Sequence, residues 1–150
     1  MFARRGIRII VMSGVLVLSV GLVGCGSLMH PRAGEFLEQA KGASGVETQI
    51  NLTNMIETSI KAVRGQTDYE AGLDVLHNQV YALKKSASQV TDEQAKTLAY
   101  AKAVTLRREV GIIFHRLWKT REDQAERDMH LDLLAHRMGE LREALQAIRG

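Results

Sequence analysis

Cys25 is the only thiol in this chain of 150 residues. It closes an uncharged apolar segment that begins at Ile9 and follows a basic start containing Arg4, Arg5 and Arg8. A basic start, an apolar run and small residues at its end are typical of a secretory signal peptide. Because the sulfur of a cysteine is a nucleophile, its position at the end of such a segment suggests a covalent modification.

The four residues Leu22, Val23, Gly24 and Cys25 resemble the lipobox of bacterial lipoproteins. The resemblance implies a signal peptide over residues 1–24, cleavage between Gly24 and Cys25, a diacylglyceryl thioether on Cys25 and an acyl group on the new amino terminus. Several acyl chains hold a protein firmly on a membrane, whereas one chain binds only marginally. No Asp directly follows Cys25, which in a Gram-negative host resembles the sorting pattern for the outer membrane. The expected location is the cell envelope, on the periplasmic face of the outer membrane.

The same segment permits a second interpretation, an uncleaved transmembrane anchor. Residues 9–29 carry no charge, and about 20 such residues are enough to span a bilayer. In both interpretations residues from 30 onward lie outside the cytoplasm, because the arginines precede the apolar segment. The order of basic start, apolar run and lipobox favours the lipoprotein.

Charge and cysteine content limit what the exported part can do. The chain has 20 basic and 17 acidic residues, and three of the basic ones are the arginines of the leader. From residue 25 onward the two signs therefore balance at 17 each, which gives no indication of nucleic-acid binding. With no second cysteine the domain has no internal disulfide, so its stability depends on packing.

The candidate metal ligands are His130 and His136, with Met129 and Met138 beside them. Histidine and methionine in an exported helical protein suggest metal binding. Two ligands on one helix need a spacing of three or four residues, whereas these two histidines are six apart. We therefore expect no metal site, and a metal- or ligand-binding sensor is the alternative function only.

Motifs for catalysis and for cofactors are missing from the sequence. It contains no Glu-x-x-His pair, no Cys-x-x-Cys-His, no Gly-x-Ser-x-Gly turn, no Walker loop and no dinucleotide-binding glycine motif. We therefore expect no enzymatic activity, and no cofactor other than the lipid on Cys25.

Residues 25–45 are expected to form the lipidated N-terminus and a flexible tether. The stretch is rich in Gly, Ser and Ala and contains the only proline, Pro31. Residues 35–41 are long enough for one or two helical turns, but the composition favours a flexible spacer.

From residue 46 to 150 the apolar spacing is helical and predicts an all-α domain, either an antiparallel helical bundle or a helical hairpin with a long, coiled-coil-like C-terminal helix. Gly65 is expected to end the first helix, and Thr67 or Asp68 to start the next. Residues 91–94 fit a capping box. The apolar faces comprise Leu52, Ile56, Ile60 and Val63; Leu73, Leu76, Val80, Leu83, Ala87 and Val90; Ala99, Ala103, Leu106, Val110, Ile113 and Leu117; and Leu131, Leu134, Met138, Leu141, Leu145 and Ile148.

A polar stretch at 119–128 separates the last two apolar faces. The phase of the spacing is preserved across it and no Gly or Pro marks a turn, which favours one helix from about residue 92 to 148, on the order of 85 Å long. A reversal near 120–128 would instead give an up-down-up-down four-helix bundle. The loss of the apolar face for about two turns supports this second arrangement. The sequence leaves both open.

Gly111 lies in the middle of a predicted helix. A glycine there costs about 1 kcal/mol relative to alanine. Either a neighbouring helix approaches closely at this point, or the glycine is a tolerated imperfection.

The C-terminal third has an apolar face that suits either a bundle core or a docking surface. The candidate docking residues are Trp118, Leu131, Leu134, Met138 and Leu141, with Trp118 as an aromatic anchor. By elimination the expected function is a non-catalytic scaffold, assembly factor or pilotin-like adaptor of the cell envelope. Its expected partners are membrane lipid, through Cys25, and another envelope protein or a second copy of itself, but not nucleic acid.

Overall fold

Helices account for most of residues 30–149, which are the residues that this computed structural model describes. The described part contains no strand, so the expected all-α class is confirmed. The elements are α2 (Ala33–Gln39), α3 (Gly45–Val63), α4 (Glu70–Lys85), the 3-10 turn η1 (Ser86–Gln89), α5 (Asp92–Ala95), α6 (Leu98–Lys119) and α7 (Gln124–Arg149). The signal peptide, the lipobox and Cys25 lie outside the described residues.

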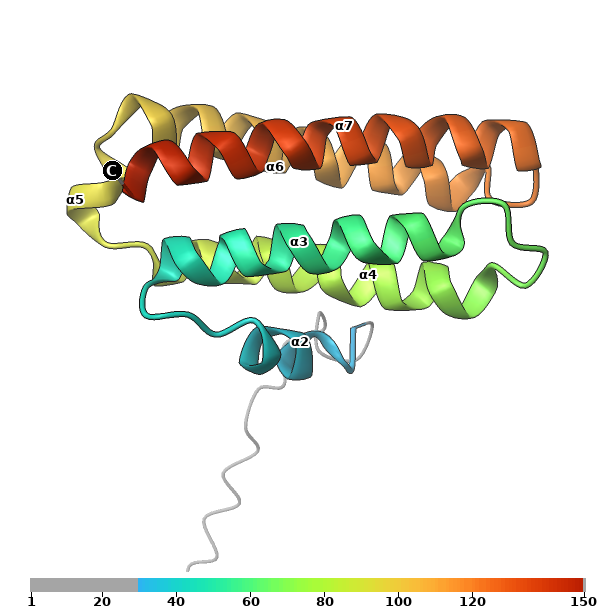
Figure 1. The fold of residues 1–150 in the computed structure, drawn as a ribbon, viewed down its shortest axis with the longest axis horizontal. Coiled ribbons are helices and arrows are strands. Elements are labelled where there is room, and N and C mark those ends of the chain that lie inside the picture. Colours follow the sequence, from blue (N-terminus) through green and yellow to red (C-terminus); the bar gives the residue numbers. More distant parts are fainter. Residues whose placement is uncertain (1–29, 150) are drawn as a thin grey trace, which may run out of the picture.

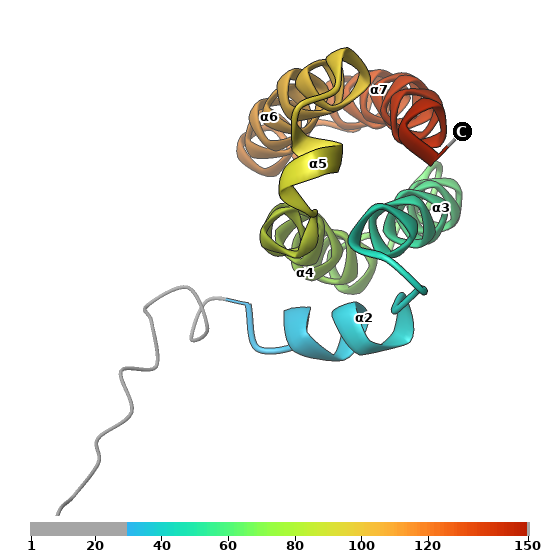
Figure 2. The same ribbon diagram turned by 90° about the vertical axis from the view of Figure 1, so that its left-hand side faces the viewer.

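The four long helices α3, α4, α6 and α7 form an antiparallel bundle with up-down-up-down connections (Figure 1). Viewed along the helices, they follow one another around a ring, and the single turn α5 bridges the end between α4 and α6 (Figure 2). Among the four long helices, α4 and α6 pack less extensively than the other neighbouring pairs. None of the described helices is both long enough and apolar enough to cross a membrane.

The core of the bundle consists largely of the apolar faces seen in the sequence. The predicted face of α3 is buried throughout, and so are the predicted faces of α6 from Ala103 to Leu117 and of α7 from Leu131 to Leu145. In α4 the face is buried except for Val80, which is half-buried. The helix does not reach Val90, because α4 gives way to η1 and then to extended backbone, but the Val90 side chain is still partly buried against the core.

Local signals explain where most of the helices begin and end. Gly65 follows α3 with a φ of +76°, the left-handed conformation that favours glycine, as expected. The capping box of Thr91 and Gln94 is present, but its helix lasts one turn because Thr97 caps a new start at α6. The predicted start at residues 67–68 is wrong, since Tyr69 occupies the N-cap position of α4 without a side-chain cap.

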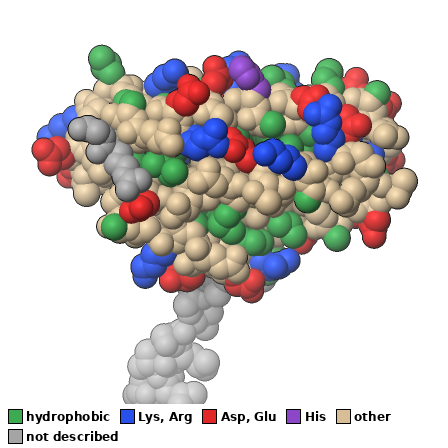
Figure 3. Space-filling view, in the orientation of Figure 1, with side chains coloured by type: hydrophobic (Ala, Val, Ile, Leu, Met, Phe, Trp, Pro, Cys, Tyr) green, Lys and Arg blue, Asp and Glu red, His purple; other side chains and the backbone are tan. Residues whose placement is uncertain are grey.

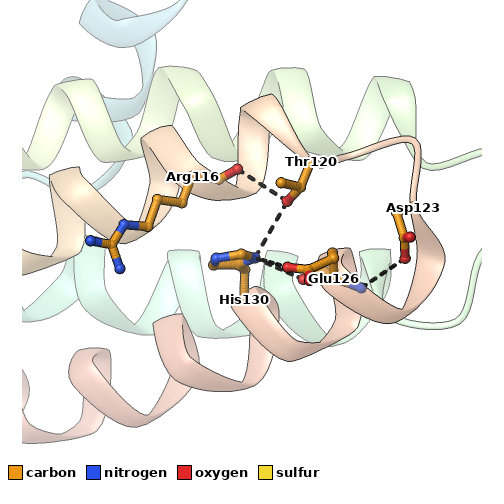
Figure 4. A network of polar contacts seen from close by, with 5 residues as sticks. All are labelled: Arg116, Thr120, Asp123, Glu126 and His130. Carbon is orange, nitrogen blue, oxygen red and sulfur yellow. Dashed lines mark hydrogen bonds and ion pairs between the residues drawn. The ribbon is translucent and has the colours of Figure 1, made fainter.

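The favoured unbroken helix from 92 to 148 is wrong, because the chain reverses between α6 and α7. The backbone N–H of Asp123 donates to the Thr120 carbonyl at 3.0 Å, which closes the turn. Asp123 Oδ1 then accepts from the Glu126 N–H at 3.0 Å and so caps the start of α7 (Figure 4). The reversal is therefore stabilised by a side-chain cap, and it occurs without the Gly or Pro that would have indicated a turn in the sequence.

Arg127 secures the same turn from inside. Its side chain is only 4% exposed, and its guanidinium lies 3.9 Å from the centre of the Tyr69 ring. Its Nη1 also donates to the Arg121 carbonyl at 2.7 Å. Arg127, which lies in the polar stretch, thus connects the turn to the start of α4 and is not a solvated residue of a continuous helix.

The flexible spacer expected up to residue 45 is also corrected, since residues 30–45 pack on the bundle. Ala33, Phe36 and Ala40 of this segment are buried, and α2 lies across α3 and α4 (Figure 2). The Arg32 N–H donates to Asn78 Oδ1 at 3.0 Å. A Cβ on Gly45 would lie 2.1 Å from the Gln89 carbonyl oxygen, so this glycine lets the start of α3 pack against η1. The packed unit therefore includes residues 30–45 and does not start at 46.

Asp123→Ala tests the cap that holds the reversal. We expect it to lower the free energy of unfolding by about 1 kcal/mol, because the Glu126 N–H loses its acceptor. Asp123→Asn should keep most of the stability, since an amide oxygen can replace the carboxylate. Urea unfolding followed by circular dichroism measures the change.

Glu122→Ala is the matched control, because it removes the same charge from an exposed neighbouring side chain. It should change the free energy of unfolding by less than about 0.5 kcal/mol. Equal effects of the two alanine variants would show that the charge, and not the cap, supports the turn.

Candidate functional site, a groove between α4 and α6

A groove of about 850 Å³ lies between α4 and α6. Its α6 wall contains Val104 and Ile112, whose side chains are 42% and 46% exposed. Its α4 wall contains Val80 and Tyr81, and residue 30 reaches it from the segment before α2. The limited packing between α4 and α6 leaves this space open to solvent.

A cluster of rings forms one part of the groove. The His77 ring stacks on Phe114 at a centroid distance of 5.2 Å and lies 5.0 Å from Trp118. His30 meets His77 edge-on at 4.3 Å and stacks on Tyr81 at 3.9 Å. Ring faces of this kind provide a large apolar contact area with little loss of side-chain entropy on binding.

The α6 wall of the groove is a second stripe of residues beside the core face of this helix. Val104, Arg108, Gly111, His115 and Trp118 alternate steps of four and three, and all five line the groove. This second stripe was present in the sequence, but sequence reasoning missed it because a glycine and two charged or titratable residues interrupt its apolar character. Only the position of α4 beside it shows that the stripe faces a hollow.

The charge of the groove is one-sided. It is lined by Lys84, Arg107 and Arg108, and none of the described residues that line it is Asp or Glu. None of these three cations forms an ion pair within the described chain. Arg107 has only a neutral partner, since its Nη1 donates to Gln49 Oε1 at 2.8 Å.

The opposite side of the bundle, formed by α3 and α7, is different. Acidic and basic side chains are interspersed on it (Figure 3). Arg142 pairs with Glu57 of α3, and Asp132 pairs with Arg64, which caps the end of α3, so both pairs link α7 to α3. Arg137 pairs with Glu109 of α6 and, within α7, with Glu140. A second hollow of about 580 Å³ lies there, and its charged lining includes Glu57 and Arg142. This surface already satisfies much of its own charge, whereas the groove does not.

The pKa values of the two histidines of the ring cluster are both lowered, which favours the neutral form of each ring. Burial lowers the pKa of His30 below its ordinary value of 6.5, and the nearby Lys84 lowers it further, while Asp74 opposes the change. Burial also lowers the pKa of His77, helped by His30 and again opposed by Asp74. Two neutral rings in contact fit an apolar surface, because a charged ring there would lose its hydration.

Most of the predicted docking residues are in the wrong place for docking. Leu131, Leu134, Met138 and Leu141 have no exposed area, because the reversal folds α7 back onto α6 and α3. They are core residues, and their expected role in partner docking is wrong. Trp118 is the exception, since it is half-buried and lines the groove.

The candidate metal ligands are separated. His130 is buried and its Nδ1–H donates to the Glu126 carbonyl at 2.8 Å, close to the Thr120 hydroxyl (Figure 4). His136 is exposed and lies 3.9 Å from a Glu140 carboxylate oxygen. Met138 is fully buried. Within the described residues, no three His, Cys, Asp or Glu side chains are placed to hold a metal ion.

The lowered pKa values of His30 and His77 predict a fold that loses stability as the pH falls below about 6.5. The unfolded chain, with a histidine pKa near 6.5, then binds more protons than the folded chain, so the free energy of unfolding decreases. We expect a lower urea midpoint at pH 5.5 than at pH 7.5. His77→Phe should keep the ring and reduce this difference.

Trp118→Phe is the control, since it changes a ring of the same cluster without removing a titratable group. It should leave the pH dependence unchanged. The ion pair that lowers the pKa of Glu140 does not interfere, because it loses strength only below about pH 4.5. A pH dependence that survives in His77→Phe and in the His30→Phe, His77→Phe double variant would contradict the assignment.

Comparisons of the chain with protein-family models, with curated proteins and with solved structures found no match. Function must therefore be argued from the chemistry of the described surface. That surface offers ring faces, aliphatic side chains and unpaired cations in one groove, which together are suited to binding.

Proposed function

We propose that this chain is a lipid-anchored, non-catalytic adaptor of the bacterial cell envelope, and that it holds another envelope protein in the groove between α4 and α6. The observation that carries the proposal is the groove itself. It combines exposed aliphatic side chains, the half-buried Trp118 and unpaired cations, which are the features of a protein-binding surface.

The anchor part of the proposal depends on Cys25 and its lipobox. Residues 1–24 would be removed, and the lipid on Cys25 would hold the domain at the membrane, on the periplasmic face of the outer membrane in a Gram-negative host. The balanced charge of the remaining chain supports lipid, and not electrostatic attraction, as the means of attachment.

The alternative, a metal-binding sensor that uses His130 and His136, has no comparable support. The first ring is buried and bonded to backbone, the second is exposed, and Met138 belongs to the core. The structure does not bring these side chains together, so the groove is the better basis for a function.

Mass spectrometry of the native protein tests the anchor. We expect an N-terminal residue 25 that carries a thioether-linked diacylglycerol, and a protein that separates with the membrane fraction. Cys25→Ser should keep its leader and carry no lipid, since a hydroxyl does not replace the thiolate as nucleophile. A native protein with a free thiol and an intact leader would contradict the lipoprotein.

Photo-cross-linking in the native cells tests the adaptor. A photoreactive residue at Ile112 should give one discrete adduct with another envelope protein, because this side chain stands at the groove. The control places the same photoreactive residue at Leu133 of α7, which is another exposed aliphatic position and lies outside the groove. Equal adducts from both positions, or none from Ile112, would contradict the proposed function.

A further inference from the structure

Gly111 is a helix-interior glycine that nothing in the described fold explains. A Cβ built on it would meet no heavy atom of a neighbouring described helix within 4 Å. The glycine weakens α6, because its backbone loses more freedom on folding than that of alanine. Gly139 in α7 is open in the same way, so an open glycine is not informative by itself.

The surroundings distinguish the two glycines. Gly111 lies in the apolar groove beside Ile112, and Val104 stands two turns before it on the same side of α6. Gly139 lies in the charged hollow of the α3–α7 side, beside His136 and Glu140. A glycine leaves room for the backbone of a second helix, and Val104 and Ile112 offer that helix apolar contacts near Gly111, while Arg108 and His115 lie one turn before and after it.

The length and shape of the groove fit one short helix. The stripe from Val104 to Trp118 covers four turns of α6, about 21 Å at 1.5 Å per residue. Both walls are helices whose backbone groups already bond within the helix, so the groove offers no free edge to an extended strand. Its side chains recur every three or four residues, which matches the ridges of a helix laid into it.

The charges specify the flanks of that helix. Lys84 on one wall and Arg107 and Arg108 on the other have no acidic partner in the described chain. A segment with Asp or Glu beside its apolar stripe would supply the missing partners, whereas a basic segment would be repelled.

We propose that the occupant of the groove is an amphipathic helix of a partner protein, with acidic residues beside its apolar stripe and with its backbone crossing over Gly111. This inference rests on the proposed adaptor function and names the chemistry of its partner. The acidic flanks determine which partner binds, and the glycine determines how closely it packs.

Two synthetic peptides of about 15 residues, four turns of helix, test the charge. They share one apolar stripe and carry either Glu or Lys on both sides of it, with no aromatic residue. Trp118 is the only tryptophan of the chain and lines the groove, so its emission reports binding to the mature protein in phosphatidylcholine vesicles. We expect the Glu peptide to bind at least about tenfold more tightly than the Lys peptide, with an advantage that decreases as salt is added.

Arg108→Glu should reverse this preference, because it places an acidic side chain in the groove. Arg116→Glu is its matched control, since it makes the same charge change on an exposed residue of α6 that does not line the groove. Equal affinities of the two peptides for the unchanged protein, or no change of Trp118 emission with either, would overturn the acidic helix.

Gly111→Ala and Gly139→Ala test the close approach. Both should raise the midpoint of thermal unfolding by a few degrees, because each replaces an open helix-interior glycine. Only Gly111→Ala should lower the affinity for the Glu peptide, by about fivefold or more, because the added methyl group overpacks the contact between the two helices. Unchanged affinity in Gly111→Ala would overturn the crossing over this residue.

The outcomes separate this inference from the function on which it rests. A protein adduct at Ile112 without a preference for the Glu peptide would leave the adaptor standing and overturn its acidic helical partner. Vesicles containing phosphatidylglycerol that change Trp118 emission and displace the peptide would identify the groove as a membrane contact, which also overturns the inference.

Discussion

The reversal of the chain at Thr120–Asp123 determines which surfaces of this protein are internal. It brings α7 back along α6 and α3, and so buries a stripe of leucines that a continuous helix would have left without partners. The cap by Asp123 and the buried guanidinium of Arg127 hold the turn from its two sides. With α7 in place, Trp118 is left at the edge of the core, where it faces the groove.

The distribution of charge over the bundle follows from the same arrangement. Ion pairs tie α7 to α3 and α6, so the cations on that side are largely neutralised within the protein. The cations beside the groove lie near aromatic and aliphatic side chains and have no such partners in the described chain. From residue 25 onward the charges balance in number but are unevenly distributed over the surface, and the unpaired cations lie beside the apolar groove.

Much of the fold could be predicted from the sequence, because helix faces and caps are local signals. The apolar faces of α3, α6 and α7 are where their spacing placed them, and Gly65 ends α3 as expected. The reversal could not be predicted from periodicity, since the phase of the two faces agrees across it by coincidence. The groove could not be predicted from the sequence for another reason. It depends on the distance between α4 and α6, which neither helix specifies alone.

The packing of residues 30–45 sets a geometric limit on the proposed anchor. Cys25 precedes residue 30 by five residues, and five peptide units cannot span more than about 18 Å in any conformation. A spacer of 20 residues would allow a reach of about 70 Å. Under the proposed lipidation of Cys25, the shorter distance would confine the bundle to the lipid surface, together with whatever it binds.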